Sequence, residues 1–219
     1  MLRYALVLLA FVTLPAAVTV AEGTAVNEEG FASLFDGKTL DHWQGGKDGY
    51  EIAADGVLVC LPQGSGNLYT AKEYGDFHYK FDFKLSPGAN NGIGIRTPLQ
   101  GDPAYVGMEI QVLDNTAEQY KNLKPYQFHG SIYGVVAAKR EFLKPVGEWN
   151  SEEIICHGKH VKVILNSETI VDADIEKASD PKTIDGREHP GLKRDKGFIC
   201  FCGHGTRVEF RNLFIKELK

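Results

Sequence analysis

The chain has 219 residues, of which 43% are hydrophobic and 24% are charged, values typical of one globular domain with a sizeable core. Its formal net charge of −5 provides no basic surface to recruit nucleic acid, so we expect no nucleic-acid partner.

The N-terminal segment has the pattern of an export signal. Arg3 precedes an apolar run over 4–21, and Thr19 and Ala21 fit the −3 and −1 positions of a cleavage site. We therefore expect a signal peptide at 1–21 and an exported mature domain at 22–219, periplasmic or extracellular and free of the membrane after cleavage. An uncleaved anchor is the alternative, disfavoured because the run contains a proline and is near the lower length limit for spanning.

The mature chain reads as β-strands throughout. Alternating or apolar runs bounded by turn residues predict strands at 77–85, 92–96, 108–113, 131–137, 152–158, 160–165, 169–175, 197–203 and 207–218. Because no amphipathic helix pattern of 10–15 residues separates them, we expect an antiparallel sandwich or barrel. Asn166 is expected to take a left-handed conformation in a hairpin turn.

Two longer segments, 97–107 and 176–196, interrupt the strand pattern. The second is rich in proline, glycine and charge. Loops of this length in a compact domain are usually functional or mobile, so both are candidates to border a site.

Cysteines and cofactor motifs say little about function. The chain has Cys60, Cys156, Cys200 and Cys202, whose spacing favours buried free thiols over a disulfide such as Cys60 with Cys156. The sequence has no P-loop, HExxH or GxSxG pattern. No cofactor is evident, and the participation of a divalent cation stays open.

The stretch MEIQVLD, residues 108–114, carries the main candidate chemistry. Strand alternation puts Glu109 and Gln111 on one face, and a bulge at Val112-Leu113 would return Asp114 to that face. Two carboxyl groups and an amide on one sheet can support acid/base work on a sugar. The alternative, a solvated face of an edge strand, is equally compatible with the pattern alone.

Neighbouring segments add polar candidates. Asn90 and Asn91 precede a strand that ends at Arg96, which in isolation also suits an Asn-Gly turn followed by a surface arginine. His204 lies between two glycines, where the backbone can approach a ligand and an imidazole can titrate near neutrality. A plain glycine-rich turn is the simpler interpretation of that motif.

Trp43 and Tyr133 are aromatic candidates for stacking on sugar rings. Residues of both types are more often part of a core.

Several of these motifs together resemble one family. FASLFDGKTLDHWQG is similar to the opening of the 3-keto-disaccharide hydrolase domain family, and NNGIGIR, MEIQVLD, GSIYGV and GFICFCGHG follow in the family's order. The match runs from about Phe31 to Leu218, nearly the whole mature chain. The ordered set of motifs is specific, although no single motif is.

The resemblance implies a concanavalin-like jelly-roll sandwich of two antiparallel sheets with a ligand site on the concave face. It also implies a substrate glycoside already oxidised at C3 by an upstream sugar 3-dehydrogenase. A 3-ketone acidifies the proton on C2, so a base can remove it and expel the C1 substituent; water can then add to the resulting enone. The resemblance leaves open whether this protein performs elimination, hydration or both.

The resemblance also suggests roles for the candidate residues. Glu109 would be the general base or acid, Asp114 the second carboxyl group, and His204 an aid to proton transfer. Substrate hydroxyls or the ketone would be held by Asn90, Asn91, Gln111 and Arg96, with Arg96 or a cation stabilising an enolate.

The sequence departs from the family at one position of interest. Phe201-Cys202 stands where the family commonly has Leu-Gln, which puts substrate choice or catalysis in doubt if that glutamine binds ligand. Two other functions therefore stay open: an endo-glucanase on the same fold, and a non-catalytic, lectin-like carbohydrate-binding module.

Overall fold

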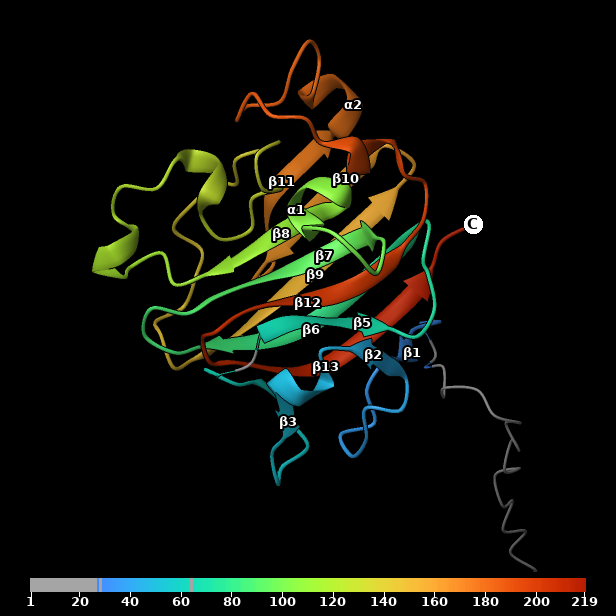
Figure 1. The fold of residues 1–219 in the computed structure, drawn as a ribbon, viewed down its shortest axis with the longest axis vertical. Helices are drawn as coiled ribbons and strands as arrows, with labels where there is room; N and C mark the ends of the chain where they lie inside the picture. Colours follow the sequence, from blue (N-terminus) through green and yellow to red (C-terminus); the bar gives the residue numbers. More distant parts are fainter. Residues whose placement is uncertain (1–26, 28, 64) are drawn as a thin grey trace, which may run out of the picture.

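Two antiparallel sheets lie face to face in the computed structural model, which describes residues 27, 29–63 and 65–219 (Figure 1). The eight-stranded sheet has the order β11-β10-β9-β6-β13-β4-β3, with β1 pairing to β13. Its strands are β1 (Ala32–Ser33), β3 (Tyr50–Ile52), β4 (Leu58–Cys60), β6 (Phe77–Leu85), β9 (Trp149–His157), β10 (His160–Leu165), β11 (Glu168–Asp174) and β13 (Val208–Glu217).

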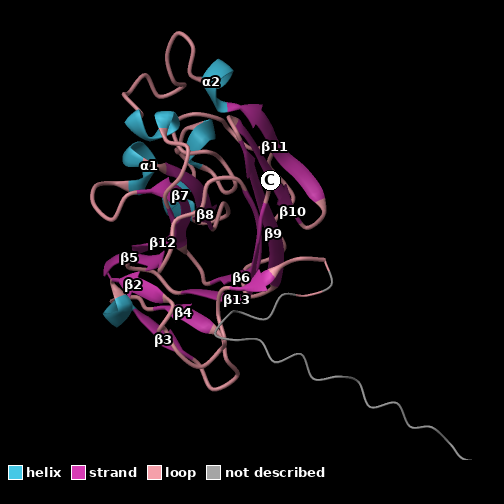
Figure 2. Cartoon of the chain, turned by 90° about the vertical axis from the view of Figure 1, so that its right-hand side faces the viewer, coloured by secondary structure: helices cyan, strands magenta, loops and turns pink. Residues whose placement is uncertain are grey.

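The five-stranded sheet forms the second layer, seen beside the first in Figure 2. Its order is β2-β5-β12-β7-β8, and its strands are β2 (Trp43–Gly45), β5 (Ser65–Thr70), β7 (Asn90–Thr97), β8 (Met108–Leu113) and β12 (Phe198–His204). The predicted all-β sandwich of two antiparallel sheets is confirmed.

Alternation of side chains explains how the two layers meet. In β6 the aromatic residues Phe77, Tyr79, Phe81 and Phe83 are all buried, while the intervening polar residues are half-buried on the other face. Side chains on one face of a strand share one environment, so this strand contributes four rings to the core between the sheets.

Helices are short and confined to the connections. They are α1 (Pro103–Val106), α2 (Ile175–Ala178) and the 3₁₀ turns Lys47–Gly49, Glu118–Tyr120, Pro125–Gln127 and Pro190–Lys193. None of the helices in the described part of the chain is long and apolar enough to cross a membrane.

The strand predicted at 131–137 is wrong. Only isolated bridges join Ile132 to Ile110 and to Val136, and the segment turns at Gly130 and Gly134, whose φ values are 77° and 73°. Positive φ interrupts the strand conformation, so this segment folds along the free edge of β8 as a loop.

Three further predictions concern Asn166, the cysteines and the N-terminal segment. Asn166 has a φ of 50°, which confirms the predicted left-handed turn. All four cysteines are free and buried, as expected. The predicted signal peptide at 1–21 lies outside the described residues and stays a prediction.

Candidate active site

The outer face of the five-stranded sheet, pointing away from the core, carries the candidate site. Regular pairing of β7 with β8 puts Glu109, Gln111 and Leu113 on this face, opposite the core residues Ile110 and Val112. Strand alternation therefore places the carboxylate and the amide together, as the sequence predicted.

The β7 position that lies against the Glu109 side chain is a glycine. Gly92 on β7 pairs with Gln111 beside Glu109, and a Cβ at Gly92 would lie 1.9 Å from Oε1 of Glu109 and 2.6 Å from its Cδ. The missing side chain lets the Glu109 carboxylate lie flat against the sheet. Glu109 is only 4% exposed as a result.

His204, at the end of β12, approaches the same carboxylate. Its Nε2 lies 3.4 Å from Oε1 of Glu109, and its side chain is 45% exposed. The contact with Glu109 raises the pKa of His204 above its ordinary value, although burial works in the opposite direction. The geometry therefore joins a buried carboxylate to a partly exposed imidazole that favours its cationic form.

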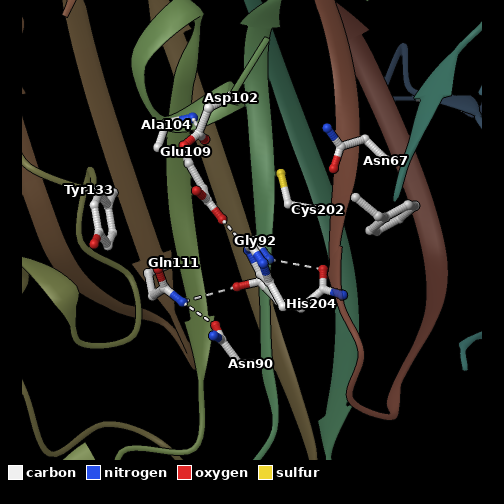
Figure 3. Close-up of polar contacts among 12 residues, drawn as sticks. Asn67, Asn90, Gly92, Asp102, Ala104, Glu109, Gln111, Tyr133, Cys202 and His204 are labelled. Carbon is white, nitrogen blue, oxygen red and sulfur yellow. Dashed lines mark hydrogen bonds and ion pairs between the residues drawn. The ribbon is translucent and has the colours of Figure 1, made fainter. Parts of the chain in front are cut away.

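The side-chain amides of Gln111 and Asn90 lie beside Glu109 on the same face of the sheet (Figure 3). Gln111 donates from Nε2 to Oδ1 of Asn90 at 2.7 Å and to the backbone carbonyl of Asn91 at 3.2 Å. The backbone N–H of Asn90 donates to the Thr206 hydroxyl, which donates in turn to the Asn90 carbonyl. These bonds fix the orientation of both amides next to Glu109 and His204.

A cavity of about 360 Å³ opens above Glu109, Gln111, Asn90 and His204, which form its floor. Its walls come from connecting segments: the α1 loop, the 114–136 segment and the 176–196 loop. The lining residues from these segments are Asp102, Ala104, Tyr105, Tyr120, Leu123, Gln127, Tyr133 and Arg187. The cavity thus has a polar floor and a mixed wall that includes three tyrosines, whose rings can contact the apolar faces of a sugar.

Tyr133 is in the cavity wall, as proposed for a stacking residue. Its hydroxyl accepts a hydrogen bond from Gln127 at 2.9 Å, and its ring meets Tyr105 and Tyr126 edge to face. Sequence reasoning missed Asp102, Tyr105 and the other wall residues. For Asp102, Ala104, Tyr105 and Arg187 the available signal was the length of the two predicted loops, which marked segments but no particular side chain. Tyr120, Leu123 and Gln127 lie outside both loops.

Asp114 does not face the cavity. The β7–β8 register runs without a shift through Leu113, so the predicted bulge is absent and Leu113 takes the third outward position. The Asp114 carboxylate instead accepts hydrogen bonds from the backbone of Gly88 and from the N–H and hydroxyl of Thr116. Although burial opposes ionisation, these bonds hold the pKa of Asp114 below its usual range. Asp114 is a turn residue.

Arg96 is also structural. It is 1% exposed, and its guanidinium donates to the carbonyls of Gly75, Gly158 and Arg194 and to the Asp76 carboxylate at 2.8 Å. Every acceptor belongs to a connection between strands, and none of them lines the cavity. The expected role of Arg96 in binding substrate is therefore not supported by its position.

Asn91 and Trp43 point into the protein. Asn91 follows Asn90 in β7, so alternation turns it to the core side, where it is fully buried and accepts from the N–H of Gly92. Trp43 is 2% exposed, donates its indole N–H to the Leu34 carbonyl and packs on Phe201. Neither side chain lines the cavity.

Of the two residues that depart from the family motif, Phe201 packs in the core between the sheets, whereas Cys202 is on the outer side of β12. The Sγ atoms of Cys202 and Cys200 are 3.8 Å apart, and both residues are buried. The contact with Cys200 and burial raise the pKa of the Cys202 thiol well above its ordinary value, so it remains a neutral thiol.

Among residues 27, 29–63 and 65–219, no group of three or more His, Cys, Asp or Glu side chains is arranged to hold a metal ion.

Comparisons with known proteins agree with the motif analysis. Residues 30–216 match the family described as the 3-keto-alpha-glucoside-1,2-lyase-like domain. The chain is 28% identical over 232 residues to the 3-keto-disaccharide hydrolase of Bacteroides thetaiotaomicron, with coverage of 88% of this chain and 80% of that protein.

Two solved structures have folds similar to that of this chain. A presumed glycosyl hydrolase from Parabacteroides distasonis ATCC 8503 is similar with a TM-score of 0.75 and 32% identity, over 86% of this chain and 99% of that one. A Bacillus subtilis protein with a galectin-like fold has a TM-score of 0.56 at 12% identity, over 85% of this chain and 94% of that one. At that identity the likeness concerns the fold alone, and it confirms the predicted concanavalin-like class of sandwich.

Proposed function

Since this chain belongs to the 3-keto-alpha-glucoside-1,2-lyase-like domain family, we propose that it cleaves glycosides whose sugar carries a ketone at C3, with Glu109 and His204 as the reacting pair. The observation that supports this most directly is the contact between a 4%-exposed carboxylate and an imidazole at the floor of a sugar-sized cavity.

The first step uses Glu109 as a base. A ketone at C3 acidifies the C2–H bond, so the carboxylate removes that proton and the electron pair moves into an enolate. As the ketone reforms, the pair forms the C1–C2 double bond and the C1–O bond breaks. The cationic form of His204, favoured by its contact with Glu109, donates a proton to the departing oxygen.

The short distance between Glu109 and His204 suits a reaction at two neighbouring carbons of the sugar. C2–H and C1–O are on neighbouring carbons, and the Glu109 and His204 atoms are 3.4 Å apart. Water can then add to C1 of the enone with the roles reversed: His204 takes the proton from water, and protonated Glu109 returns one to C2. The two steps together give net hydrolysis, and the same pair can serve elimination, hydration or both.

Orientation of the sugar would depend on the fixed amides. Gln111 and Asn90 bind each other and border the cavity, so they are placed to meet sugar hydroxyls or the ketone oxygen. Tyr133 and Tyr105 would contact the apolar faces of the sugar. We expect the substrate to come from an upstream sugar 3-dehydrogenase, and the export-signal pattern at 1–21 supports a reaction outside the cytoplasm.

An ordinary endo-glucanase is less compatible with this site. Retaining glycosidases need two carboxyl groups about 5 Å apart across the scissile bond. On β8 the position after Gln111 on the outer face belongs to Leu113, and the Asp114 carboxylate is held in a turn. Asp102, the other carboxylate that lines the cavity, caps α1 by accepting from the N–H of Ala104. A carbohydrate-binding module remains the alternative outside catalysis, because a sandwich of this class does not itself dictate chemistry.

The test compares a 3-keto-glucoside with its unoxidised parent, using mature protein and the Glu109→Gln variant. We expect turnover of the keto compound alone, reduced by at least about 10²-fold in Glu109→Gln. Turnover of the parent would indicate an ordinary glycosidase. Binding of sugar by both proteins without turnover of either compound would indicate a binding module.

A further inference from the structure

Arg187 lines the cavity that contains Glu109 and His204, and it supplies the guanidinium group of that lining. It stacks over the Tyr105 ring, with its Cζ 4.1 Å from the ring centroid, and NH1 donates to the Tyr105 hydroxyl. The guanidinium forms no ion pair with any residue that the structure describes, whereas exposed cations such as Lys72 do. Its remaining N–H groups are available to an acceptor.

The backbone beneath this side chain is held on both sides. The N–H of Arg187 donates to the Asp185 carboxylate at 2.9 Å, and its carbonyl accepts from the Thr183 hydroxyl at 2.7 Å. Asp185 also pairs with His189 at 3.1 Å, and both of these side chains are at most 3% exposed. His189 in turn lies 3.0 Å from the Ala104 carbonyl, next to Tyr105. The backbone of this exposed arginine is thus held by the buried contact between Asp185 and His189, which lowers the entropy cost of using the residue to bind.

A second cavity, of about 490 Å³, lies on the other side of Arg187. Arg187 lines both cavities, so the second adjoins the sugar cavity. Lys159, Lys182 and Lys193 also line it, and these cations outnumber its two carboxylates, Glu176 and Glu188. Lys159 is paired with Asp195, so Arg187, Lys182 and Lys193 supply the small excess of positive charge over Glu176 and Glu188 in this lining.

We propose that Arg187 is a specificity residue that binds an anionic group, such as a carboxylate, on the leaving part of the substrate. The proposal rests on the proposed function: the sugar occupies the floor at Glu109 and the aglycone extends across Arg187 toward the cationic cavity. A planar guanidinium with free donors suits a carboxylate, which it can bind through two parallel hydrogen bonds.

The experiment uses two pairs of probes. Binding is measured calorimetrically with 4-carboxyphenyl glucoside and its neutral methyl ester, and turnover with the 3-keto form of each. The proteins are the mature chain, Arg187→Gln and Lys72→Gln. Lys72 is a matched control because it is exposed, lines neither cavity and carries the same charge.

We expect the mature chain to prefer the carboxylate over the ester, and Arg187→Gln to lose about fivefold of that preference in both binding and turnover. Lys72→Gln should keep it, and higher salt should weaken it in the mature chain. An unchanged preference in Arg187→Gln, an equal loss in Lys72→Gln or no binding of either glucoside would overturn the proposal. Absent turnover with the Arg187-dependent preference retained in binding would instead refute the proposed reaction and leave the anion site standing.

Discussion

Replacing Gly92 by alanine should disable the site while leaving the sandwich folded. The new Cβ would lie 1.9 Å from Oε1 of Glu109 and 2.6 Å from both Cδ and Cγ, so three consecutive atoms of that side chain must move. Reaching the 3.4 Å at which ordinary contact begins requires a shift of about 1.5 Å, the difference between the two distances. Misplacement of a catalytic group by about 1 Å costs on the order of 10²-fold in rate, so we expect kcat/KM to fall at least that far.

Gly94→Ala is the matched control for this substitution. Gly94 is two residues away on the same face of β7, and its added Cβ would meet Sγ of Cys200 at 2.5 Å rather than Glu109. Overpacking of either kind should lower the free energy of unfolding by about 1–3 kcal/mol, measured by urea denaturation. Only Gly92→Ala should also lower kcat/KM on a 3-keto-glucoside. Full activity in a folded Gly92→Ala protein would refute the placement of Glu109 at the reacting centre.

Three further predictions concern ionisable groups. Because contact with Glu109 raises the pKa of His204, activity that needs the imidazolium should persist above pH 6.5 and fall as pH rises through that pKa; Glu109→Gln should lower the His204 pKa in an NMR titration. Asp114→Ala should cost about 1–3 kcal/mol in urea denaturation by orphaning buried donors, with kcat unchanged, and the stabilisation by Asp114 should disappear as pH falls through its lowered pKa. Arg96→Lys should destabilise the fold by about 2–4 kcal/mol, because an ammonium cannot replace four guanidinium bonds, while KM stays the same; a changed KM with normal stability would contradict the structural role.

The strands that were predicted well share a strong local signal. The ranges of β6 and β8 match the predicted 77–85 and 108–113, because aromatic or apolar residues alternate with polar ones along each of them. Short strands such as β1 and β2 have two or three residues, too few to show a period. The same alternation placed Glu109 and Gln111 on one face, the part of the site that sequence could specify.

The errors at the site come from contacts between distant segments. Asp114 was assigned to the cavity through a bulge, but whether a strand bulges depends on the register of its partner, which sequence does not display. Arg96 was assigned to substrate binding from its place at a strand end, although carbonyls 62 and 98 residues away surround its guanidinium. Asp102 and Arg187 lie in loops without periodicity, so only the fold identifies them as cavity residues.

The contact between the Glu109 carboxylate and the His204 imidazole fits the chemistry of an oxidised sugar. An unoxidised glycoside breaks through a positively charged sugar, which a second carboxylate near C1 stabilises. With a 3-ketone, negative charge develops on the enolate, so a nearby cation stabilises the transition state. In this site the group beside Glu109 is His204, whose cationic form is favoured, while Asp114 is turned away into its own hydrogen bonds. The imidazole beside Glu109, and not the predicted Asp114 carboxyl group, therefore supports chemistry on a ketone.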